Sequence, residues 1–161
     1  MVSLSRKNQG FTIVELLIVI VVIGILVGLV YVTFTGVTQK RRNSERQTDI
    51  GALNAHIEAF YAQTDNYPTF AQLNDASWRG TNMKGLNPDA LVDPKGGTIT
   101  STPPGANTFH YSYTPTQSSG GSATACSSAD VDTNDTACDT YTLQANLEGS
   151  TQPNAYTKQS N

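Results

Sequence analysis

The 161-residue sequence predicts an α+β protein in which one long N-terminal helix packs on a small antiparallel β-sheet. A strongly apolar segment fills residues 11–34, an amphipathic helical pattern follows at 35–64, and two later segments alternate between apolar and polar residues. Charged residues make up only 14% of the chain, against roughly 25% in a typical globular domain. With a net charge of −3, this uneven composition excludes an ordinary cytoplasmic enzyme.

Residues 11–34 are long and apolar enough to form a membrane-spanning helix. Nineteen of these 24 residues are hydrophobic, and Leu16–Val32 contains no polar side chain. At about 1.5 Å per residue the helix would be about 36 Å long, which exceeds the roughly 30 Å hydrocarbon core of a bilayer. The alternatives are a cleavable secretory signal peptide and a plain single-pass anchor. A signal peptide is disfavoured because the apolar run is too long and no A-x-A cleavage site follows it.

Three features of this segment go beyond a plain anchor. The preceding decapeptide is polar and basic and ends in Gly10, one carboxylate (Glu15) interrupts the apolar run, and Gly24 and Gly28 form a small-xxx-small pair. A charged side chain inside a bilayer costs on the order of 2.5–3.5 kcal/mol on insertion scales, so Glu15 needs a partner. The two glycines allow another helix to approach closely, which makes them candidate helix-packing residues.

Residues 35–64 predict a helix that continues from the apolar segment to about Gln63. Its apolar residues recur at helical spacings and form one stripe, namely Ile50, Leu53, Ile57, Phe60 and Tyr61. We expect the basic run Lys40–Arg42 to be a solvated face at the end of the span, with anionic lipid headgroups or a neighbouring subunit as alternative partners. The segment Asn66–Thr69 ends the helix because Pro68 disfavours helical backbone in the residue before it.

Residues 65–161 are expected to form a head with three or four strands. We expect one short helix near Ala71–Trp78, and four apolar residues covering the stripe: Trp78, Leu86, Leu91 and Val92. Alternation at Phe109–Tyr113 and at Tyr141–Glu148 predicts strands. Cys126 and Cys138 enclose eleven residues and fit a disulfide, which requires an oxidising compartment. Closing a loop of this size stabilises the fold by roughly 3 kcal/mol.

The sequence does not support catalysis, and it predicts no cofactor, no metal and no specific nucleic-acid binding. His56 and His110 have no partner at a fixed spacing, and no nucleophile, phosphate-loop or metal motif is present. The loop between the cysteines resembles the start of a calcium loop, with oxygen ligands at Asp130, Asp132, Asn134 and Asp135. It lacks the sixth-position glycine and the twelfth-position glutamate, so a solvated loop is favoured there.

The pattern RKNQG-FTIVELLIVIVVIGIL resembles the N-terminus of type IV prepilins and of the related type II secretion pseudopilins. Over residues 6–26 the basic leader, glycine, Phe-Thr, glutamate and apolar run have the family's spacing. The resemblance implies that a prepilin peptidase cleaves after Gly10, that Phe11 is then N-methylated, and that Glu15 meets the terminal amine of a neighbour during assembly. The alternatives for Glu15 are its own amine or the headgroup level. The segment DNYPTFAQL also resembles the YPT segment that follows the spine in many pseudopilins and some pilins.

The resemblance implies a cleaved leader (1–10), a transmembrane and polymerisation helix (11–34), an amphipathic spine (35–64) and a head (65–161) with a disulfide loop (126–138). It implies a structural subunit of a type IV pilus-like filament. The alternatives are a pseudopilin of a type II secretion or competence (DNA-uptake) system, or a membrane-tethered binding domain that never polymerises.

The expected partners are further copies of the chain and other pilins in a helical polymer, the prepilin peptidase, an inner-membrane assembly platform, and the cytoplasmic membrane before assembly. The resemblance places the leader in the cytoplasm and the head outside, on a cell-surface filament after assembly. The count of Lys and Arg, two before the span and four after it, favours the opposite orientation.

Overall fold

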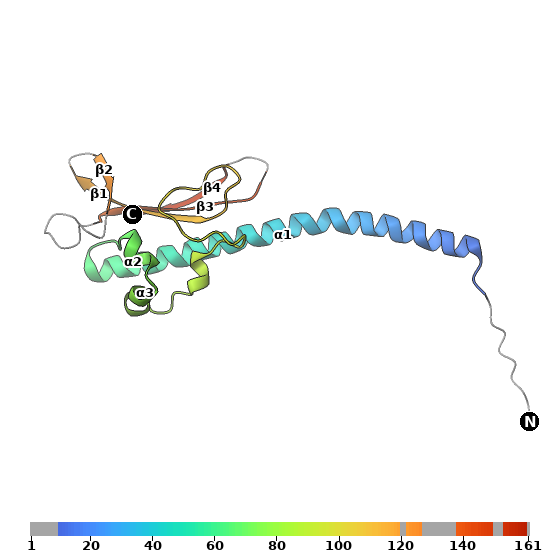
Figure 1. The fold of residues 1–161 in the computed structure, drawn as a ribbon, viewed down its shortest axis with the longest axis horizontal. Helices are drawn as coiled ribbons and strands as arrows, with labels where there is room; N and C mark the ends of the chain where they lie inside the picture. The colour runs from blue at the N-terminus through green and yellow to red at the C-terminus, as the bar shows by residue number, and fades with distance from the viewer. Residues whose placement is uncertain (1–9, 120–121, 127–137, 150–152, 161) are drawn as a thin grey trace, which may run out of the picture. The chain divides into compact units, whose positions relative to one another are not determined.

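The computed structural model describes residues 10–119, 122–126, 138–149 and 153–160 (Figure 1). The chain divides into two compact units, Met1–Gln39 and Lys40–Asn161. Helix α1, Ile13–Thr64, contributes its first half to one unit and its second half to the other. The second unit also holds the sheet and the short helices, and it is the head of the protein.

The first half of α1 is apolar on all sides and is not covered by the described residues. The large hydrophobic side chains described along it are exposed, with Ile13 88%, Leu17 55% and Leu29 66% exposed. By length and composition this helix could cross a membrane. An apolar surface of this extent is unstable in water, so it needs lipid or other helices around it.

The second half of α1 buries one apolar stripe, as the periodicity predicts. Ile50, Leu53 and Ile57 are fully buried, and Phe60 and Tyr61 pack against the same core at partial exposure. These side chains repeat every three or four residues, which places them on one face of the helix. The stripe provides the surface on which the head is built.

The head contains one four-stranded antiparallel sheet with the strand order β2-β1-β3-β4. Its strands are β1 (Tyr111–Ser119), β2 (Ser122–Ala125), β3 (Thr140–Asn146) and β4 (Ala155–Gln159). Figure 1 shows the sheet lying along the second half of α1. The side chains that face the helix come from alternate positions and are buried: Tyr111, Tyr113, Tyr141, Leu143 and Ala145. Both predicted strands are confirmed, although β1 begins at Tyr111 rather than Phe109.

The segment between α1 and the sheet holds two short helices. The prediction of a single helix near Ala71–Trp78 is therefore wrong. Helix α2 covers Phe70–Asn74 and α3 covers Ala76–Asn82, and a 3₁₀ turn, η1, follows at Pro88–Leu91. Asp75 separates α2 from α3 because its backbone is extended and its carboxylate caps α3, accepting the N–H groups of Ser77 and Trp78.

The expected cover of the apolar stripe is correct except at one position. Leu91 is buried, and Trp78 and Leu86 are partly buried against the core. Val92 is 41% exposed, and the prediction that it covers the stripe is wrong. Its backbone is extended, so its side chain points away from the side on which Leu91 and Asp93 are buried.

A disulfide joins Cys126 and Cys138, with the two Cα atoms 5.9 Å apart. The N–H of Cys126 donates to the carbonyl of Pro115, and the carbonyl of Cys138 accepts the N–H of Tyr67 at 2.9 Å. The disulfide therefore links the end of β2 to Cys138, which pairs with Tyr67 in the segment that follows α1. The four oxygen-bearing residues considered as calcium ligands, 130, 132, 134 and 135, lie outside the described residues.

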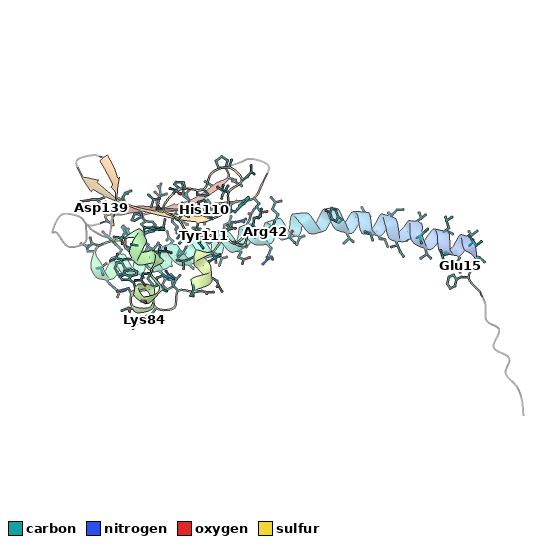
Figure 2. All side chains as sticks on the ribbon, viewed as in Figure 1. Glu15, Arg42, Lys84, His110, Tyr111 and Asp139 are labelled. Carbon is teal, nitrogen blue, oxygen red and sulfur yellow. A yellow bond between two sulfur atoms is a disulfide. The ribbon has the colours of Figure 1, made fainter. Side chains whose placement is uncertain are left out.

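Tyrosine hydroxyls form a polar layer between the sheet and α1. Tyr111, labelled in Figure 2, donates to Asp49 at 2.7 Å, and Tyr141 donates to Glu58 at 2.6 Å. Tyr67 donates to the second oxygen of Glu58 at 3.3 Å, and its ring packs edge-on against Tyr141. Burial and the nearby carboxylate charge raise the pKa of Tyr67 to about 12. The same causes raise the pKa values of Tyr111 and Tyr141 well above the ordinary value.

We predict that this layer makes the head sensitive to alkali. The folded-state tyrosine pKa values lie above the unfolded value of about 10, so their stabilisation is complete below pH 10 and is lost as the pH rises towards 12. Denaturant unfolding of the full chain in detergent, monitored from pH 8 to 12, should show this loss. At pH 11, tyrosinate absorbance of the folded chain should fall short of that of the urea-unfolded chain, and equal absorbance would contradict the prediction.

Candidate functional site

The cleavage position predicted from the sequence lies just before α1. Gly10, Phe11 and Thr12 are not helical, and Phe11 is 77% exposed. A Cβ added at Gly10, Gly24 or Gly28 would meet no atom within 4 Å. The fold of a single chain therefore gives no steric reason for these three glycines. Any requirement for them comes from an enzyme or from another helix.

Glu15 lies in the first turn of α1, as Figure 2 shows, and closes a capping box with Thr12. The carboxylate of Glu15 accepts the N–H and the hydroxyl of Thr12, each at 3.4 Å, and the N–H of Glu15 donates to the Thr12 hydroxyl at 3.2 Å. The T-x-x-E spacing was a readable signal for this cap, and the sequence interpretation missed it. The cap supplies hydrogen bonds to Glu15 but no opposite charge.

Gly24 and Gly28 lie one turn apart on the exposed apolar part of α1. Without side chains they lower the helix surface at one place, while Ile23, Ile25 and Val27 around them are exposed. A second helix can approach closely at such a place, and van der Waals contact then replaces contact with lipid. The first half of α1 thus presents an apolar surface for packing, with one carboxylate near its start.

At the start of the head, a group of ionic side chains joins α1 to two other segments, and we call it the charge clamp. Arg46 pairs with Asp93 through two hydrogen bonds of 2.6 and 2.9 Å, and both side chains are fully buried. Arg42 pairs with Glu148 through two bonds of 2.6 Å, and Arg46 and Lys95 reach the same carboxylate at 2.9 and 3.2 Å. The clamp attaches the end of β3 and the 93–97 turn to one face of the helix.

The clamp is satisfied on all sides by further polar contacts. The Asn43 side chain donates to the carbonyl of Glu148 and accepts its N–H, at 2.8 Å in each case. The hydrogen bond from Arg42, with those from Arg46 and Lys95, holds the pKa of Glu148 at about 2, although burial acts in the opposite direction. Burial alone would lower the pKa of Arg46, but its bonds to Asp93 and Glu148 raise it. Arg42, Arg46 and Glu148 are therefore ionised at neutral pH.

A glycine turn brings Asp93 to Arg46. Gly96 has a φ of +90°, which an L-residue rarely adopts, and a Cβ at Gly97 would lie 2.1 Å from the carbonyl oxygen of Phe109. The ring of Phe109 lies 3.9 Å from the Lys95 ammonium and 4.9 Å from the Arg46 guanidinium. These two glycines are required by the fold, unlike those of the first half of α1.

The clamp corrects the prediction that Lys40–Arg42 is a solvated basic face. Lys40 is exposed and Arg41 is 69% exposed, but Arg42 is paired with Glu148 and only 25% exposed. The spacing contains the signal, because Arg42 and Arg46 continue the stripe of Ile50, Leu53 and Ile57 at helical intervals. The structure does not group the two histidines into a site. His110 lies 3.2 Å from the carbonyl of Thr102, and the described residues contain no cluster of three or more metal-binding side chains.

We predict that Arg46→Met lowers the free energy of unfolding by roughly 3–5 kcal/mol, because it leaves the Asp93 carboxylate buried without a counter-charge. The double variant Arg46→Met with Asp93→Asn should recover part of this loss, since no unpaired charge remains. Denaturant unfolding of the full chain in detergent measures both.

The matched control is Arg41→Met, which removes the exposed pair between Arg41 and Glu45. Its loss should not exceed about 0.5 kcal/mol. Equal losses for Arg46→Met and Arg41→Met would show that the clamp does not hold the head together.

Comparison with known proteins identifies the motif at the start of α1. Residues 5–31 match the model of the prokaryotic N-terminal methylation motif. The chain is 35% identical over 67 residues to the type IV major pilin protein PilA of Myxococcus xanthus, covering 42% of the chain and 30% of that relative. It is 31% identical over 108 residues to the type II secretion system core protein G of Vibrio cholerae, covering 66% of the chain and 71% of that relative.

A further relative is the type II secretion system core protein G of Dickeya chrysanthemi, 32% identical over 69 residues, or 43% of the chain and 45% of that relative. The chain thus spans less than half the length of the Myxococcus and Dickeya relatives. No solved structure matches the chain. The motif at the start of α1 and the long match to core protein G show that the chain belongs to the family of type IV pilins and type II secretion pseudopilins.

Proposed function

We propose that the chain is a structural subunit of a type IV pilus-like filament, cleaved after Gly10, N-methylated at Phe11 and polymerised through residues 11–34. The observation that carries the proposal is the exposed apolar first half of α1, which holds one carboxylate that no cation of the described residues reaches. A bundle of such helices removes the apolar surface from both water and lipid. Gly24 and Gly28 support the proposal because they leave room for a neighbouring helix.

Cleavage after Gly10 supplies the charge that Glu15 lacks. It creates an α-amino group on Phe11, about one helical turn from Glu15. Inside an apolar bundle each charge is costly alone, and their attraction is strong because the dielectric constant is low. We propose that the Glu15 carboxylate of an incoming subunit pairs with the Phe11 amine of a neighbour. The two charges meet only when the subunits are at the correct axial position.

The proposal assigns the chain to the cytoplasmic membrane before assembly, with residues 1–10 in the cytoplasm and the head outside. In this proposal the chain comprises a leader (1–10), a polymerisation helix (11–34), a spine (35–64) and a head (65–161). The disulfide between Cys126 and Cys138 supports export of the head, because such bonds persist in oxidising compartments. The proposed partners are copies of the chain, other pilins, a prepilin peptidase and an inner-membrane assembly platform. The chain would then act structurally rather than as an enzyme.

A pseudopilin of a type II secretion or competence system is the second candidate function. The observation that favours it is the 108-residue match to core protein G, which is too long to be confined to α1 and must include part of the head. Filament length separates the candidates, since electron microscopy of sheared cells should show long surface fibres for a pilin. A third possibility, a tethered domain that never polymerises, predicts no filament and an intact N-terminus.

We predict that Glu15→Gln is cleaved but forms few or no filaments. Glutamine keeps the capping box with Thr12 and removes only the charge, so this variant separates capping from ion pairing. Mass spectrometry of the N-terminus and electron microscopy of sheared filaments measure the two outcomes. The control is Glu45→Gln, which removes an exposed carboxylate of the spine. If Glu15→Gln filaments were as abundant as those of the control, the charge of Glu15 would have no role in assembly.

A further inference from the structure

We infer that the filament contains an ion pair between copies, from Asp65 at the end of α1 in one copy to Lys40 of another. The inference rests on the proposed polymerisation and adds a specific contact between heads to the packing of residues 11–34. Both residues belong to the second unit and are exposed. The inference follows from a carboxylate and an ammonium group that form no ion pair within residues 10–119, 122–126, 138–149 and 153–160.

Asp65 occupies a position that is unfavourable for aspartate for two reasons. It follows the last residue of α1 with a φ of +59°, and its N–H donates to the carbonyl of Tyr61 at 2.7 Å. Helices commonly end with glycine or asparagine in this left-handed conformation, and a carboxylate there also meets the negative end of the helix dipole. Among the described residues, no hydrogen bond or ion pair reaches the carboxylate of Asp65. The side chain therefore does nothing for this fold that asparagine would not do.

Lys40 is the complementary charge at the other end of the spine. The three arginines that follow Lys40 in α1 are all paired within the chain. Arg41 pairs with Glu45, Arg42 with Glu148 and Arg46 with Asp93. Lys40 is exposed and forms no ion pair within the described part of the chain. The exposed lysines at 84 and 158 lie outside α1, in the loop after α3 and in β4.

The spacing of the two positions fits copies that are aligned in parallel. They are 25 residues apart, which corresponds to about 38 Å along an α-helix and to nearly seven whole turns. Copies in the proposed polymer point the same way, so a copy displaced by about 38 Å along the helix axis brings its Lys40 to the axial level of Asp65. The inference thus fixes one axial offset in the filament.

Charge reversal in cells that assemble the full chain tests the pair. Asp65→Lys and Lys40→Glu should each reduce the yield of sheared filaments about two- to fivefold, the range expected from one exposed ion pair per contact. The double variant should return to within about twofold of the unmodified chain. The matched control combines Asp65→Lys with Lys158→Glu, which restores the same net charge at the wrong place and should not recover.

A second variant separates the contact from a role in folding. Asp65→Asn suits the left-handed position, so thermal unfolding of the full chain in detergent should be unchanged or shifted upward. Its filament yield should still fall two- to fivefold, because the charge is lost. A variant with lower stability and normal filament yield would overturn the inference.

The outcomes also distinguish this inference from the proposed function. If the unmodified chain forms filaments and both single reversals assemble normally, or if the double variant is no better than the singles, the ion pair is absent and the filament function stands. If the unmodified chain is cleaved but forms no filament alone or with other pilins, the proposed function fails and the ion pair fails with it.

Discussion

The fully buried pair of Arg46 and Asp93 is the interaction on which the head depends. Its two charges lie within hydrogen-bond distance and both side chains are fully buried, so neither can be removed alone without leaving the other uncompensated. The pair fixes the 93–97 turn, and Glu148 extends the same network to the end of β3. Two segments that are distant in the sequence are thereby held on one face of α1.

The head is attached by polar contacts to an unusual degree, which fits its composition. The sheet contributes tyrosines rather than aliphatic residues to much of its inner face, and their hydroxyls reach Asp49 and Glu58 on α1. Tyr111 and Tyr141 each bury a large ring and also donate to a helix carboxylate. Together with the clamp and the disulfide, these contacts explain how a domain poor in aliphatic residues keeps a single structure.

Patterns with a short period predicted most of the fold. The 3.6-residue period gave α1 and its buried face, and alternation gave β1 and β3, because both patterns record which side chains are buried. Asp75 divides a predicted helix because its side chain can cap the next one, an effect of a single residue that periodicity does not record. Arg42 and Arg46 were interpreted by charge alone, although their spacing places them on the buried face. Asp93 lies 47 residues from Arg46, and Glu148 lies 106 residues from Arg42. No local pattern connects these partners.

The continuity of α1 from Ile13 to Thr64 has a mechanical consequence. In a filament of such subunits, a pulling force passes along the backbone of one helix in each subunit, and the sheet is not in series with it. The head is then loaded through its contacts with the second half of α1, which are the buried apolar stripe, the clamp and the tyrosine layer. The face of the sheet that points away from α1 carries none of this tension. Its side chains are therefore free to change without weakening the fibre.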